Sequence, residues 1–457
     1  MVFQNDILAG ASGAGGSYQI DQSIRFNFPD ASYMYRTPGV VGNRKTWTWS
    51  SWVKFSVDTN YNILFGTGGL TGAANDFVLM FDYSTSKLGV YRQSQWLFRT
   101  SAQYRDPSAW YHIVWSLDTT SATAGNRHRL YVNGSEVTSF STAKVALTLN
   151  GDYPVNNTVA HGISRGGGAA GYSYCGYQSE INFIDGQALT PTDFGETNAD
   201  GVWVPKAYEG TYGTNGFYIT GADSAALGTD YSGNGNTFTS SGLTTDDQVT
   251  DTPTDNYATL SPLIPTTSAG VFSNGNLSVY PVANAGNNQW FSTIGVSSGK
   301  WHVEAVCGRL GNNTHGYAVG IASTLNGTAN HASDSFGQLM YDSGSGNIVD
   351  ATDGSIASYA YGATFTVGDR ITCEFDLDGN SIEFFKNGAS QGTYTPDGDI
   401  SNGDTYFAVC GDRTGVVSVG YDWTFNADNF TDTPTAGFSA LSTANLPAPT
   451  IPQGSDY

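Results

Sequence analysis

Short stretches of the chain alternate apolar and polar residues, which is the period expected of β-strands. In residues 110–118 (WYHIVWSLD), the odd-numbered side chains share one face and the even-numbered side chains share the other. We expect one of these faces to meet a hydrophobic core. A second series of such runs lies between residues 299 and 412, again separated by turns rich in Gly, Asn and Asp. The pattern therefore predicts two successive groups of strands.

Two Asn-Gly pairs mark tight turns between strands. Asn133-Gly134 and Asn387-Gly388 each stand between two short apolar runs. Both residues of such a pair accept a positive φ, which the two-residue hairpin turn requires. We therefore expect one β-hairpin at each position.

The composition agrees with an all-β fold. Charged residues make up 13% of the 457 residues, while 57 glycines and an aromatic share of 13% favour turns and pleated sheets. We expect one short helical turn near residues 189–196, with Thr190 or Thr192 as its N-cap. A chain of this length exceeds one hydrophobic core. The prediction is an all-β protein with two antiparallel β-sandwich (jelly-roll) domains in tandem.

One phrase occurs twice in the chain. DTPTDNYATLS at 251–261 and DTPTAGFSALS at 432–442 share Asp-Thr-Pro-Thr, an aromatic seventh residue and a closing Leu-Ser. Each copy follows one series of strands and precedes a segment that proline stiffens, so we interpret it as the terminal clip of a domain. The predicted organisation is a Gly-rich N-terminal arm at 1–20, a jelly roll at 21–250, a Pro-containing linker at 251–266, a second sandwich at 267–431 and a Pro-rich exit segment at 432–457.

The charge balance argues against two classes of partner. The chain has 19 Lys and Arg residues against 40 Asp and Glu residues, a formal net charge of -21. Such a charge opposes binding to phosphate backbones and to anionic lipid. No run approaches the roughly 18 apolar residues that span a bilayer, and the first residues lack the pattern of a secretion signal. We expect no nucleic-acid partner, no membrane insertion and no use of the secretory route.

The first series of strands resembles the laminin-G-like, concanavalin A-like jelly roll. The resemblance rests on SIRFNFPDASYM, TWTWSSWVKF (46–55), WYHIVWSLD, the Asn133-Gly134 hairpin and CGYQSEINFIDGQALTPTDFGE (175–196). The second series resembles a SPRY domain through GKWHVEAV, YAVGIAS, VGDRITCEFDLDGNSIEFFKNG and TYFAVCGD. Both resemblances imply antiparallel β-sandwiches.

The combination of these domains is similar to structural proteins of tailed bacteriophages. DYSGNGNTFTSSGL (230–243) and the repeated Asp-Thr-Pro-Thr phrase contribute to this similarity. Such proteins are described as tail-fibre or lectin-like virion proteins. The resemblance implies a location in the virion after assembly in the host cytoplasm, with other virion proteins as partners. It also implies a role in virion attachment for the N-terminal arm at 1–20.

Related jelly rolls include glucanases, which use a pair of carboxylates at the glycosidic bond. Glu374, Asp376 and Asp378 share one face of a strand, but alternation alone explains polar residues that face solvent. Glu180 and Asp185 are five residues apart and hence on opposite faces of a regular strand. Neither set makes a catalytic pair, and we expect no enzymatic activity.

One turn resembles the start of a calcium-binding loop. Asp230, Ser232 and Asn234 alternate before Gly235, but position twelve of the loop is Ser241 instead of a bidentate Glu. Two interpretations stay open, a calcium site and a Gly/Asn turn whose side chains bond their own backbone. No other cofactor is expected.

Two loops carry residue types that bind sugars, namely aromatic faces and planar polar groups. The first loop, within 165–177, combines Arg165 with Tyr172 and Tyr174, although core packing also explains two tyrosines on one face of a strand. The second loop resembles a variable loop of SPRY domains. It supplies Arg309, Asn312, Asn313 and His315.

These features together lead us to expect adhesion as the function. Loops on rigid sandwiches would recognise a host-surface glycan or protein, and a homo-oligomer with many copies on a particle would add avidity. Two alternatives stay open. One is a decoration or cement protein that binds capsid or tail subunits and no receptor, and the other is an enzyme that cleaves surface polysaccharide.

Overall fold

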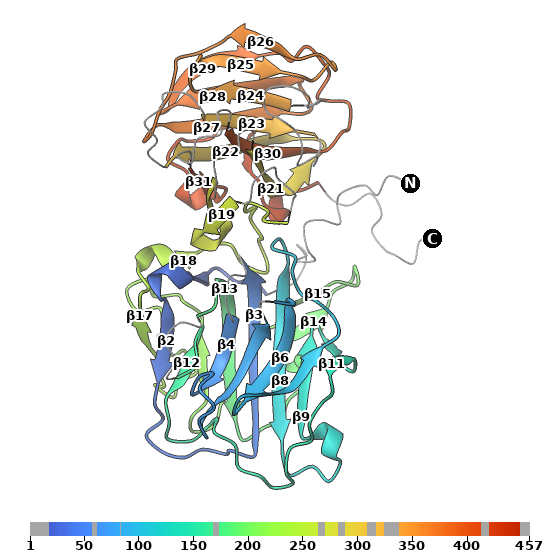
Figure 1. Ribbon diagram of the computed structural model, residues 1–457, viewed down its shortest axis with the longest axis vertical. Coiled ribbons are helices and arrows are strands. Elements are labelled where there is room, and N and C mark those ends of the chain that lie inside the picture. Colours follow the sequence, from blue (N-terminus) through green and yellow to red (C-terminus); the bar gives the residue numbers. More distant parts are fainter. Residues whose placement is uncertain are drawn as a thin grey trace. The chain divides into compact units, whose positions relative to one another are not determined.

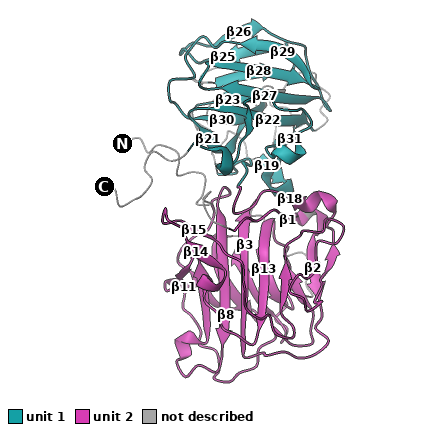
Figure 2. Ribbon diagram, turned by 180° about the vertical axis from the view of Figure 1, so that it is seen from behind, with its two compact units in different colours: residues 1–10, 256–457 teal, residues 11–255 magenta. Residues whose placement is uncertain are grey.

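The computed structural model describes residues 18–56, 62–82, 84–167, 173–263, 270–281, 288–308, 317–323, 338–412 and 420–447. These residues form two compact units, one within Ala11–Asp255 and the other from Asn256 onward (Figures 1 and 2). We call them the N-terminal unit and the C-terminal unit. Both are built from β-sheets, so the predicted all-β class is confirmed.

Helical structure within the described ranges is limited to 3-10 turns of three residues each. No helix in this part of the chain has the length and apolar character needed to cross a membrane. Thr190 caps η4 in a capping box, as the sequence predicted for one of two threonines. The turns are η2 (Phe28–Asp30), η3 (Ala124–Asn126), η4 (Pro191–Asp193), η5 (Thr245–Asp247), η6 (Asn274–Asn276), η7 (Ala427–Asn429) and η8 (Thr443–Asn445).

The N-terminal unit is a sandwich of two eight-stranded sheets. Sheet A has the order β10-β9-β8-β3-β13-β1-β18, with β16 also paired to β13, and sheet B has the order β11-β7-β6-β5-β4-β12-β2-β17. The strands of sheet A are β1 (Ser23–Phe26), β3 (Thr46–Phe55), β8 (Trp110–Asp118), β9 (His128–Val132), β10 (Ser135–Glu136), β13 (Gly176–Asp185), β16 (Phe217–Ile219) and β18 (Gln248–Val249). The strands of sheet B are β2 (Tyr33–Arg36), β4 (Asn62–Thr67), β5 (Phe77–Asp82), β6 (Lys87–Arg92), β7 (Gln95–Thr100), β11 (Phe140–Thr142), β12 (His161–Ile163) and β17 (Thr239–Ser241), and a separate ribbon contains β14 (Gly195–Thr197) and β15 (Trp203–Pro205).

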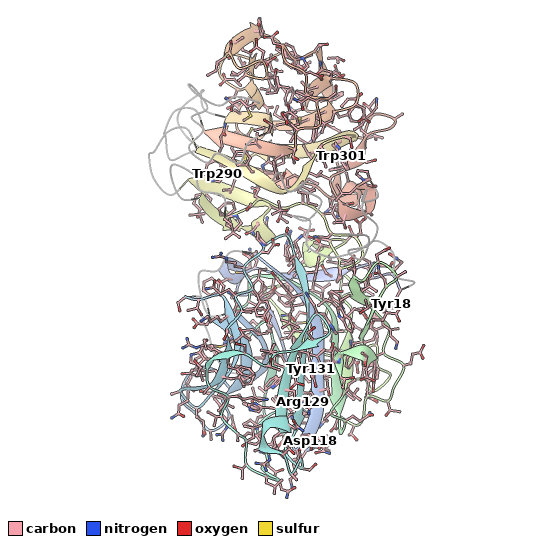
Figure 3. All side chains as sticks on the ribbon, turned by 90° about the vertical axis from the view of Figure 1, so that its right-hand side faces the viewer. Tyr18, Asp118, Arg129, Tyr131, Trp290 and Trp301 are labelled. Carbon is pink, nitrogen blue, oxygen red and sulfur yellow. The ribbon has the colours of Figure 1, made fainter. Side chains whose placement is uncertain are left out.

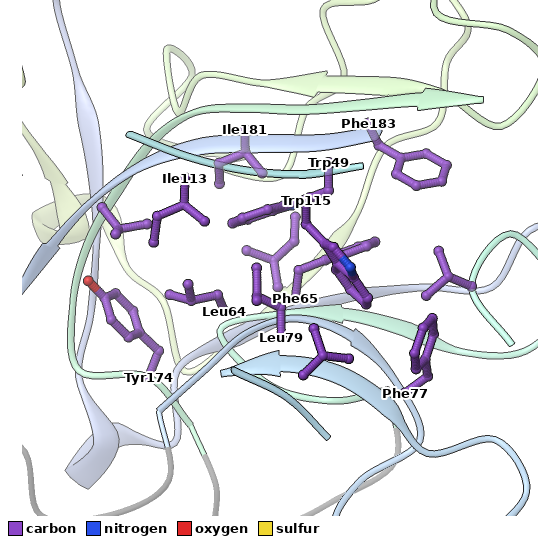
Figure 4. Packing of buried hydrophobic residues seen from close by; sticks show 14 of the residues in the cluster. Trp49, Leu64, Phe65, Phe77, Leu79, Ile113, Trp115, Tyr174, Ile181 and Phe183 are labelled. Atoms are coloured by element: carbon purple, nitrogen blue, oxygen red, sulfur yellow. The ribbon is translucent and has the colours of Figure 1, made fainter. Parts of the chain in front are cut away.

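Aromatic side chains fill the core between sheets A and B. Trp49 of β3 stacks on Phe65 of β4 with centroids 5.7 Å apart, and Trp115 of β8 meets Phe77 of β5 edge-on at 5.0 Å. Figure 4 shows these rings between the strands of the two sheets. All four are fully buried, and burial of such large apolar surfaces is the main source of stability.

Strand β8 departs from the burial that its alternation predicts. Trp115 faces the core, as expected, but Trp110 and Val114 on the opposite face are buried as well. The reason is that the chain after β13 packs over the outer face of sheet A, where Trp203 and Phe194 join clusters with these side chains. Sheet A is therefore an internal layer of its unit.

Both predicted hairpins are present. Asn133 and Gly134 have φ of 47° and 79° between β9 and β10, and Asn387 and Gly388 have φ of 52° and 81° between two strands of the C-terminal unit. Positive φ at both central residues gives the turn whose twist matches the strands beside it.

The C-terminal unit is a second sandwich. Sheet C has the order β19-β20-β31-β22-β27-β28-β29, with β32 added parallel to β22, and sheet D has the order β21-β30-β23-β24-β25-β26. Trp290 and Trp301, labelled in Figure 3, belong to the core between these sheets. The strands of sheet C are β19 (Gly270–Ser273), β20 (Ser278–Pro281), β22 (Lys300–Cys307), β27 (Arg370–Asp376), β28 (Ser381–Lys386), β29 (Ala389–Tyr394), β31 (Tyr421–Thr424) and β32 (Ser439–Ala440). The strands of sheet D are β21 (Asn288–Val296), β23 (Tyr317–Ala322), β24 (Gln338–Asp342), β25 (Asn347–Asp350), β26 (Ala357–Ala360) and β30 (Tyr406–Asp412).

The first Asp-Thr-Pro-Thr phrase closes the N-terminal unit. Oδ2 of Asp251 lies 2.7 Å from Nζ of Lys54 on β3, whose side chain is fully buried. Trp110 donates its indole N–H to Oδ1 of Asp251 at 3.1 Å, and the Ser23 hydroxyl donates to the Asp251 carbonyl at 2.6 Å. One residue thus ties the end of the unit to β1, β3 and β8.

The second phrase occupies a similar position in the C-terminal unit. The Asp432 carboxylate accepts hydrogen bonds from the guanidinium of Arg370 and from the Thr372 hydroxyl, both on β27. The closing residues of the two phrases also pair, because the Ala258 N–H donates to the Leu441 carbonyl at 2.9 Å. The beginning and the end of the C-terminal unit are therefore joined.

The boundary between the units differs from the one expected from the sequence. It lies inside the first phrase, after Asp255, and Ala258 and Leu260 are fully buried in the C-terminal core. Leu441 of the expected exit segment lies in the same core. Parts of the expected linker and exit segment therefore belong to the core of the C-terminal unit. The prolines of this segment suggested a spacer. The sequence alone does not reveal that Asp251 contacts residues far away in the chain, such as Lys54 and Trp110.

Replacing Asp251 should strongly destabilise the N-terminal unit. Asp251→Asn removes the carboxylate charge that lies against the buried ammonium of Lys54, which should lower the free energy of unfolding by about 3–5 kcal/mol. Urea denaturation of the purified chain measures the change. Asp200→Asn, at an exposed position, is the control and should shift stability by no more than about 0.5 kcal/mol. Equal effects of both variants would contradict the role of Asp251 in stabilising the N-terminal unit.

Three histidines of the N-terminal unit are buried. His112 lies between the rings of Trp52 and Trp203, with centroids 4.9 and 6.0 Å away. Burial lowers the pKa of His112 and His128 to about 3 and that of His161 to about 4. All three are therefore neutral in the folded unit at neutral pH.

Acid should destabilise this unit. Below the ordinary histidine pKa of 6.5, the unfolded chain takes up protons that the folded unit does not accept. The free energy of unfolding therefore decreases as the pH is lowered. Each histidine should contribute about 1.4 kcal/mol per pH unit between 6.5 and its folded pKa. Hydrogen exchange of β3 and β8 in urea at pH 7 and pH 5 measures the slope. His128→Gln should reduce it by about a third, and an unchanged slope would contradict the assignment.

Candidate functional site

A pair of tyrosines lies on the outer face of sheet B. Tyr33 and Tyr35 of β2 have ring centroids 5.9 Å apart, and Tyr35 is 41% exposed. The guanidinium of Arg165 lies 4.3 Å from the centre of the Tyr33 ring, within the range of a cation–π contact. We call these three residues the tyrosine–arginine face.

The turn after β12 places Arg165 over Tyr33. The chain folds back over β12 because Gly162 has no side chain, and a Cβ there would come within 2.1 Å of the Arg165 carbonyl oxygen. Ser164 has a φ of 65°, in the left-handed region, and donates its N–H to the Leu64 carbonyl at 3.0 Å. The turn is thereby fixed on the sheet.

Hydroxyl groups flank the tyrosines. In the pairing of β2 with β17, Thr239 lies opposite Tyr35 and Ser241 lies opposite Tyr33. Residues directly opposite each other in an antiparallel pair share a face. The site therefore combines aromatic rings, a guanidinium and two hydroxyls on a firm sheet, which suits a ligand with both apolar C–H faces and hydroxyl groups.

A shallow polar cavity is a second candidate site in the N-terminal unit. Asn234 fixes its wall, because the side-chain N–H groups donate to the carbonyls of Gly213 and Gly216 at 2.7 and 2.9 Å. The cavity has a volume of about 550 Å³ and is lined by Gly210, Thr211, Tyr212, Gly213, Thr214, Ser232 and Asn234. Its lining thus offers hydroxyls, an amide and one aromatic ring.

The turn that resembles a calcium loop is hydrogen-bonded to itself. Oδ1 of Asp230 accepts the N–H groups of Tyr218 and Ser232, and Oδ2 accepts the N–H of Asn236 and the Ser232 hydroxyl, all within 2.6–2.9 Å. Among the described residues, no group of three or more His, Cys, Asp or Glu side chains could hold a metal ion. The arrangement favours the Gly/Asn turn, and Ser232 and Asn234 line the cavity.

The other predicted sugar-binding residues have different outcomes. Tyr174 is fully buried in the core and donates its hydroxyl to the Lys54 carbonyl at 2.5 Å, so its expected role in ligand stacking is wrong. Packing in the core is the alternative that the sequence left open. Arg165 is partly exposed. Tyr172, Arg309, Asn312, Asn313 and His315 lie outside the described residues.

Glu180 and Asp185 are both tied into the fold. Glu180 sits at a bulge of β13 with a φ of 51°, and it accepts hydrogen bonds from the hydroxyls of Tyr218 and Tyr18 at 2.7 and 3.0 Å. Figure 3 labels Tyr18. Burial raises the pKa of Glu180. Asp185 accepts two backbone N–H groups at 2.8 and 3.0 Å. The two acids therefore serve separate networks.

The acids of β27 do not face solvent as the alternation suggested. Glu374 and Asp376 are 2% and 7% exposed. Asp376 pairs with Lys300 at 2.7 Å, and Glu374 contacts Nδ1 of His302 at 2.9 Å. The chain that follows η7 covers Glu374, because the Thr435 N–H donates to its carboxylate at 2.7 Å. Each carboxylate thus has a structural partner.

Sequence reasoning overlooked Tyr33 and Tyr35. Their signal is the alternation in SYMYR, where a buried Met34 turns both neighbouring tyrosines to the outer face. A search for aromatic residues on the polar side of short strands would have found them.

Part of the N-terminal unit is similar to concanavalin A-like proteins. The model of the concanavalin A-like lectin/glucanases superfamily matches residues 29–193. Over 153 residues the chain is 28% identical to the ATP-dependent RNA helicase DDX1 of Xenopus laevis, a match that covers 34% of this chain and 19% of the helicase. The chain therefore corresponds to less than a fifth of that relative.

Several solved structures are similar to parts of the chain. The SPRY domain of human HERC1 matches at 17% identity and a TM-score of 0.30, over 36% of this chain and 96% of that domain. A Bacteroides ovatus protein to which carbohydrate binding is ascribed matches at 15% identity and a TM-score of 0.30, over 49% of this chain and 58% of its own. A heptameric SAP-like pentraxin from Limulus polyphemus matches at 18% identity and a TM-score of 0.27, over 37% and 78%.

Gly162 should be essential for the tyrosine–arginine face. Gly162→Ala brings a methyl group against the Arg165 carbonyl, which should lower the free energy of unfolding by about 1–3 kcal/mol and displace the turn. Thermal unfolding measures the loss. Gly39→Ala is the matched control, because a Cβ at Gly39 has no neighbour within 4 Å. If both variants melted alike, the turn would not depend on Gly162.

Proposed function

We propose that this chain is a non-enzymatic structural protein of a bacteriophage particle that acts as an adhesin for host-surface glycan. The observation that carries the proposal is the tyrosine–arginine face, where the exposed Tyr35 stands beside the stacked pair of Tyr33 and Arg165. The match to a lectin-containing superfamily supports the glycan, and the resemblance to virion proteins supports the particle.

The chemistry of this face fits a saccharide better than it fits a flat apolar partner. Aromatic rings pack against the C–H faces of a sugar, while guanidinium and hydroxyl groups bond its hydroxyls. Thr239 and Ser241 supply such hydroxyls beside the rings. The polar cavity offers the same types of group and provides a second place for a sugar residue.

Weak single sites become effective through repetition. A shallow open site holds a sugar loosely, and many copies on one particle raise the effective concentration of the remaining sites. We therefore propose a homo-oligomer in the particle. The engagement of Glu180, Asp185, Glu374 and Asp376 in structural contacts supports a role without catalysis.

Cell-binding measurements test this function. Labelled protein should bind susceptible host cells and compete with infection, and Tyr35→Ala or Arg165→Ala should weaken binding roughly tenfold, the equivalent of about 1.4 kcal/mol. Tyr359→Ala is the matched control, because Tyr359 is 42% exposed and belongs to the C-terminal unit. Its binding should equal that of the unaltered chain.

The same material separates the alternatives. Binding to particles stripped of this protein, without binding to cells, would replace the adhesin by a decoration protein. Release of new reducing sugar ends from host polysaccharide would replace it by an enzyme. Unchanged cell binding by both Tyr35→Ala and Arg165→Ala would remove the tyrosine–arginine face from the proposal.

A further inference from the structure

A second pair of aromatic rings lies on sheet B, at β6 and β7. Tyr91 and Trp96 lie opposite each other in the pairing of these strands, and their ring centroids are 5.4 Å apart. The guanidinium of Arg99 lies 5.2 Å from the centre of the Trp96 ring, within the range of a cation–π contact. All three residues are partly exposed. We call them the tryptophan–arginine face.

These rings belong to the outer face of sheet B. Val78 of β5 lies opposite Tyr91 on the neighbouring strand. Both rings pack on a small apolar cluster that is separate from the core of the sandwich and contains Ile63, Val78 and Met80. The cluster supports the rings from the side of the sheet, so their exposed parts face solvent.

Gly89 makes room for the indole. It stands on β6 two residues before Tyr91, and a Cβ there would come within 2.8 Å of the Trp96 ring. The same Cβ would come within 2.4 Å of the Phe98 carbonyl oxygen. Trp96 can lie against β6 because Gly89 has no side chain.

Arg99 is fixed beside the indole by two neighbours. Its Nη1 lies 2.5 Å from Oδ2 of Asp82, and its Nε donates to the Thr142 hydroxyl at 3.0 Å. The Arg99 side chain is still 31% exposed. A guanidinium that is already oriented loses little entropy when it bonds a ligand.

The tryptophan–arginine face repeats the groups of the tyrosine–arginine face. Each has two aromatic rings, with centroids 5.4 and 5.9 Å apart, and each has one guanidinium over a ring, at 5.2 and 4.3 Å. Such rings pack against C–H faces of sugars, and guanidinium groups bond sugar hydroxyls. Two faces with the same groups fit a ligand whose units repeat.

The two faces lie at the ends of one cross-strand row. Residues opposite each other in antiparallel pairs share a face of the sheet. The row consists of Tyr35, Gly162, Gly66, Val78, Tyr91 and Trp96. Figure 1 labels β2, β12, β4 and β6 in this order across the sheet. From β2 to β6 the sheet spans four strand spacings, which is roughly 19 Å.

Two loops cover the middle of this row. The turn after β12 covers one part, and Leu70 of the loop after β4 packs on the apolar cluster. A Cβ at Gly166 would come within 2.4 Å of the Gly68 carbonyl oxygen, so the two loops pack closely because Gly166 has no side chain. Asp76 fixes the second loop, since its carboxylate accepts four backbone N–H groups of residues 69–73 at 2.6–3.1 Å. A ligand that contacts both faces therefore crosses firmly held loops.

We propose that the tryptophan–arginine face is a saccharide-binding site and that it holds the same polysaccharide strand as the tyrosine–arginine face. The proposal rests on the proposed function, and it narrows the ligand to a polymer of repeated sugar units. A disaccharide is too short to reach from Tyr35 to Tyr91. A strand held at one face raises the effective concentration of sugar at the other.

Titration with fragments of two lengths tests this proposal. The probes are disaccharide fragments, and longer fragments able to span both faces, of polysaccharide purified from the host cells that bind the labelled protein. The unaltered chain should bind the longer fragment at least about tenfold more tightly, because only this fragment contacts both faces. Calorimetry measures both affinities and the number of disaccharides bound per chain. Equal affinities would overturn the proposal and leave the proposed function intact.

Substitutions assign the effect to the two faces. Trp96→Ala should remove one bound disaccharide per chain and lower the affinity for the longer fragment about tenfold. Tyr35→Ala should remove a different disaccharide, so that the double variant loses both. Tyr359→Ala, at an exposed position of the C-terminal unit, is the matched control and should bind as the unaltered chain does. Unchanged binding of both fragments by Trp96→Ala would overturn the proposal.

Footprinting of the unaltered chain decides if Trp96→Ala fails to fold. Hydroxyl-radical oxidation of Trp96 should fall when the longer fragment is bound, while oxidation of Tyr359 should stay constant. Unchanged oxidation of Trp96 in the bound chain would overturn the proposal. If the unaltered chain bound neither fragment, the proposed function itself would be contradicted, and this proposal with it.

Discussion

Each sandwich depends on a carboxylate that neutralises a base held inside a sheet. A fully buried ammonium such as that of Lys54 costs several kcal/mol unless an anion lies against it. Asp251 comes from the end of the unit, while Lys54 lies on β3, which sits between β8 and β13. The pair requires that sheet A is assembled, so residues at the end of the unit complete the electrostatics of the central strand. Asp432 and Arg370 repeat this logic on β27.

The segments that cover the outer faces of the sheets limit where a ligand could bind. The outer face of sheet A is covered by Trp203 and Phe194, and the central part of the outer face of sheet C is covered by residues 430–438. On sheet B, Tyr35 of β2 is 41% exposed where β2 pairs with β17. Surface chemistry is thereby concentrated on loops and on the end of one sheet, which is where the tyrosine–arginine face lies.

Local signals predicted much of the fold. The period-two runs gave the strands, the Asn-Gly pairs gave both hairpins, and Thr190 was one of two expected caps. These features depend on neighbours in sequence. The repeated phrase could be assigned to domain ends from its position after each series of strands. Its partners, Lys54 and Arg370, lie far away in the chain and could not be found from spacing.

The candidate site was harder to predict, because exposure depends on what covers a face. Tyr174 and Tyr35 both lie in short runs that alternate tyrosine with another residue, yet the first lies in the core and the second is exposed. Glu180 was placed by assuming a regular β13, and the bulge at its positive φ breaks that assumption. Arg165 was chosen for its loop, and the structure adds the reason it lies over Tyr33, namely the turn that Gly162 allows over β12.

His112 and His302 show that strand register determines the direction in which the pKa of a histidine is shifted. His112 and His302 both follow an aromatic residue by one or two positions in a strand, so their local sequences, WYH and KWH, suggest the same packing role. The cross-strand partner of His112 is Trp52, whereas that of His302 is Glu374. An aromatic partner desolvates the ring and keeps it neutral, while a carboxylate partner favours the proton. One residue type therefore responds to pH in opposite directions in the two units, and the pairing of strands, which no single strand encodes, sets the direction.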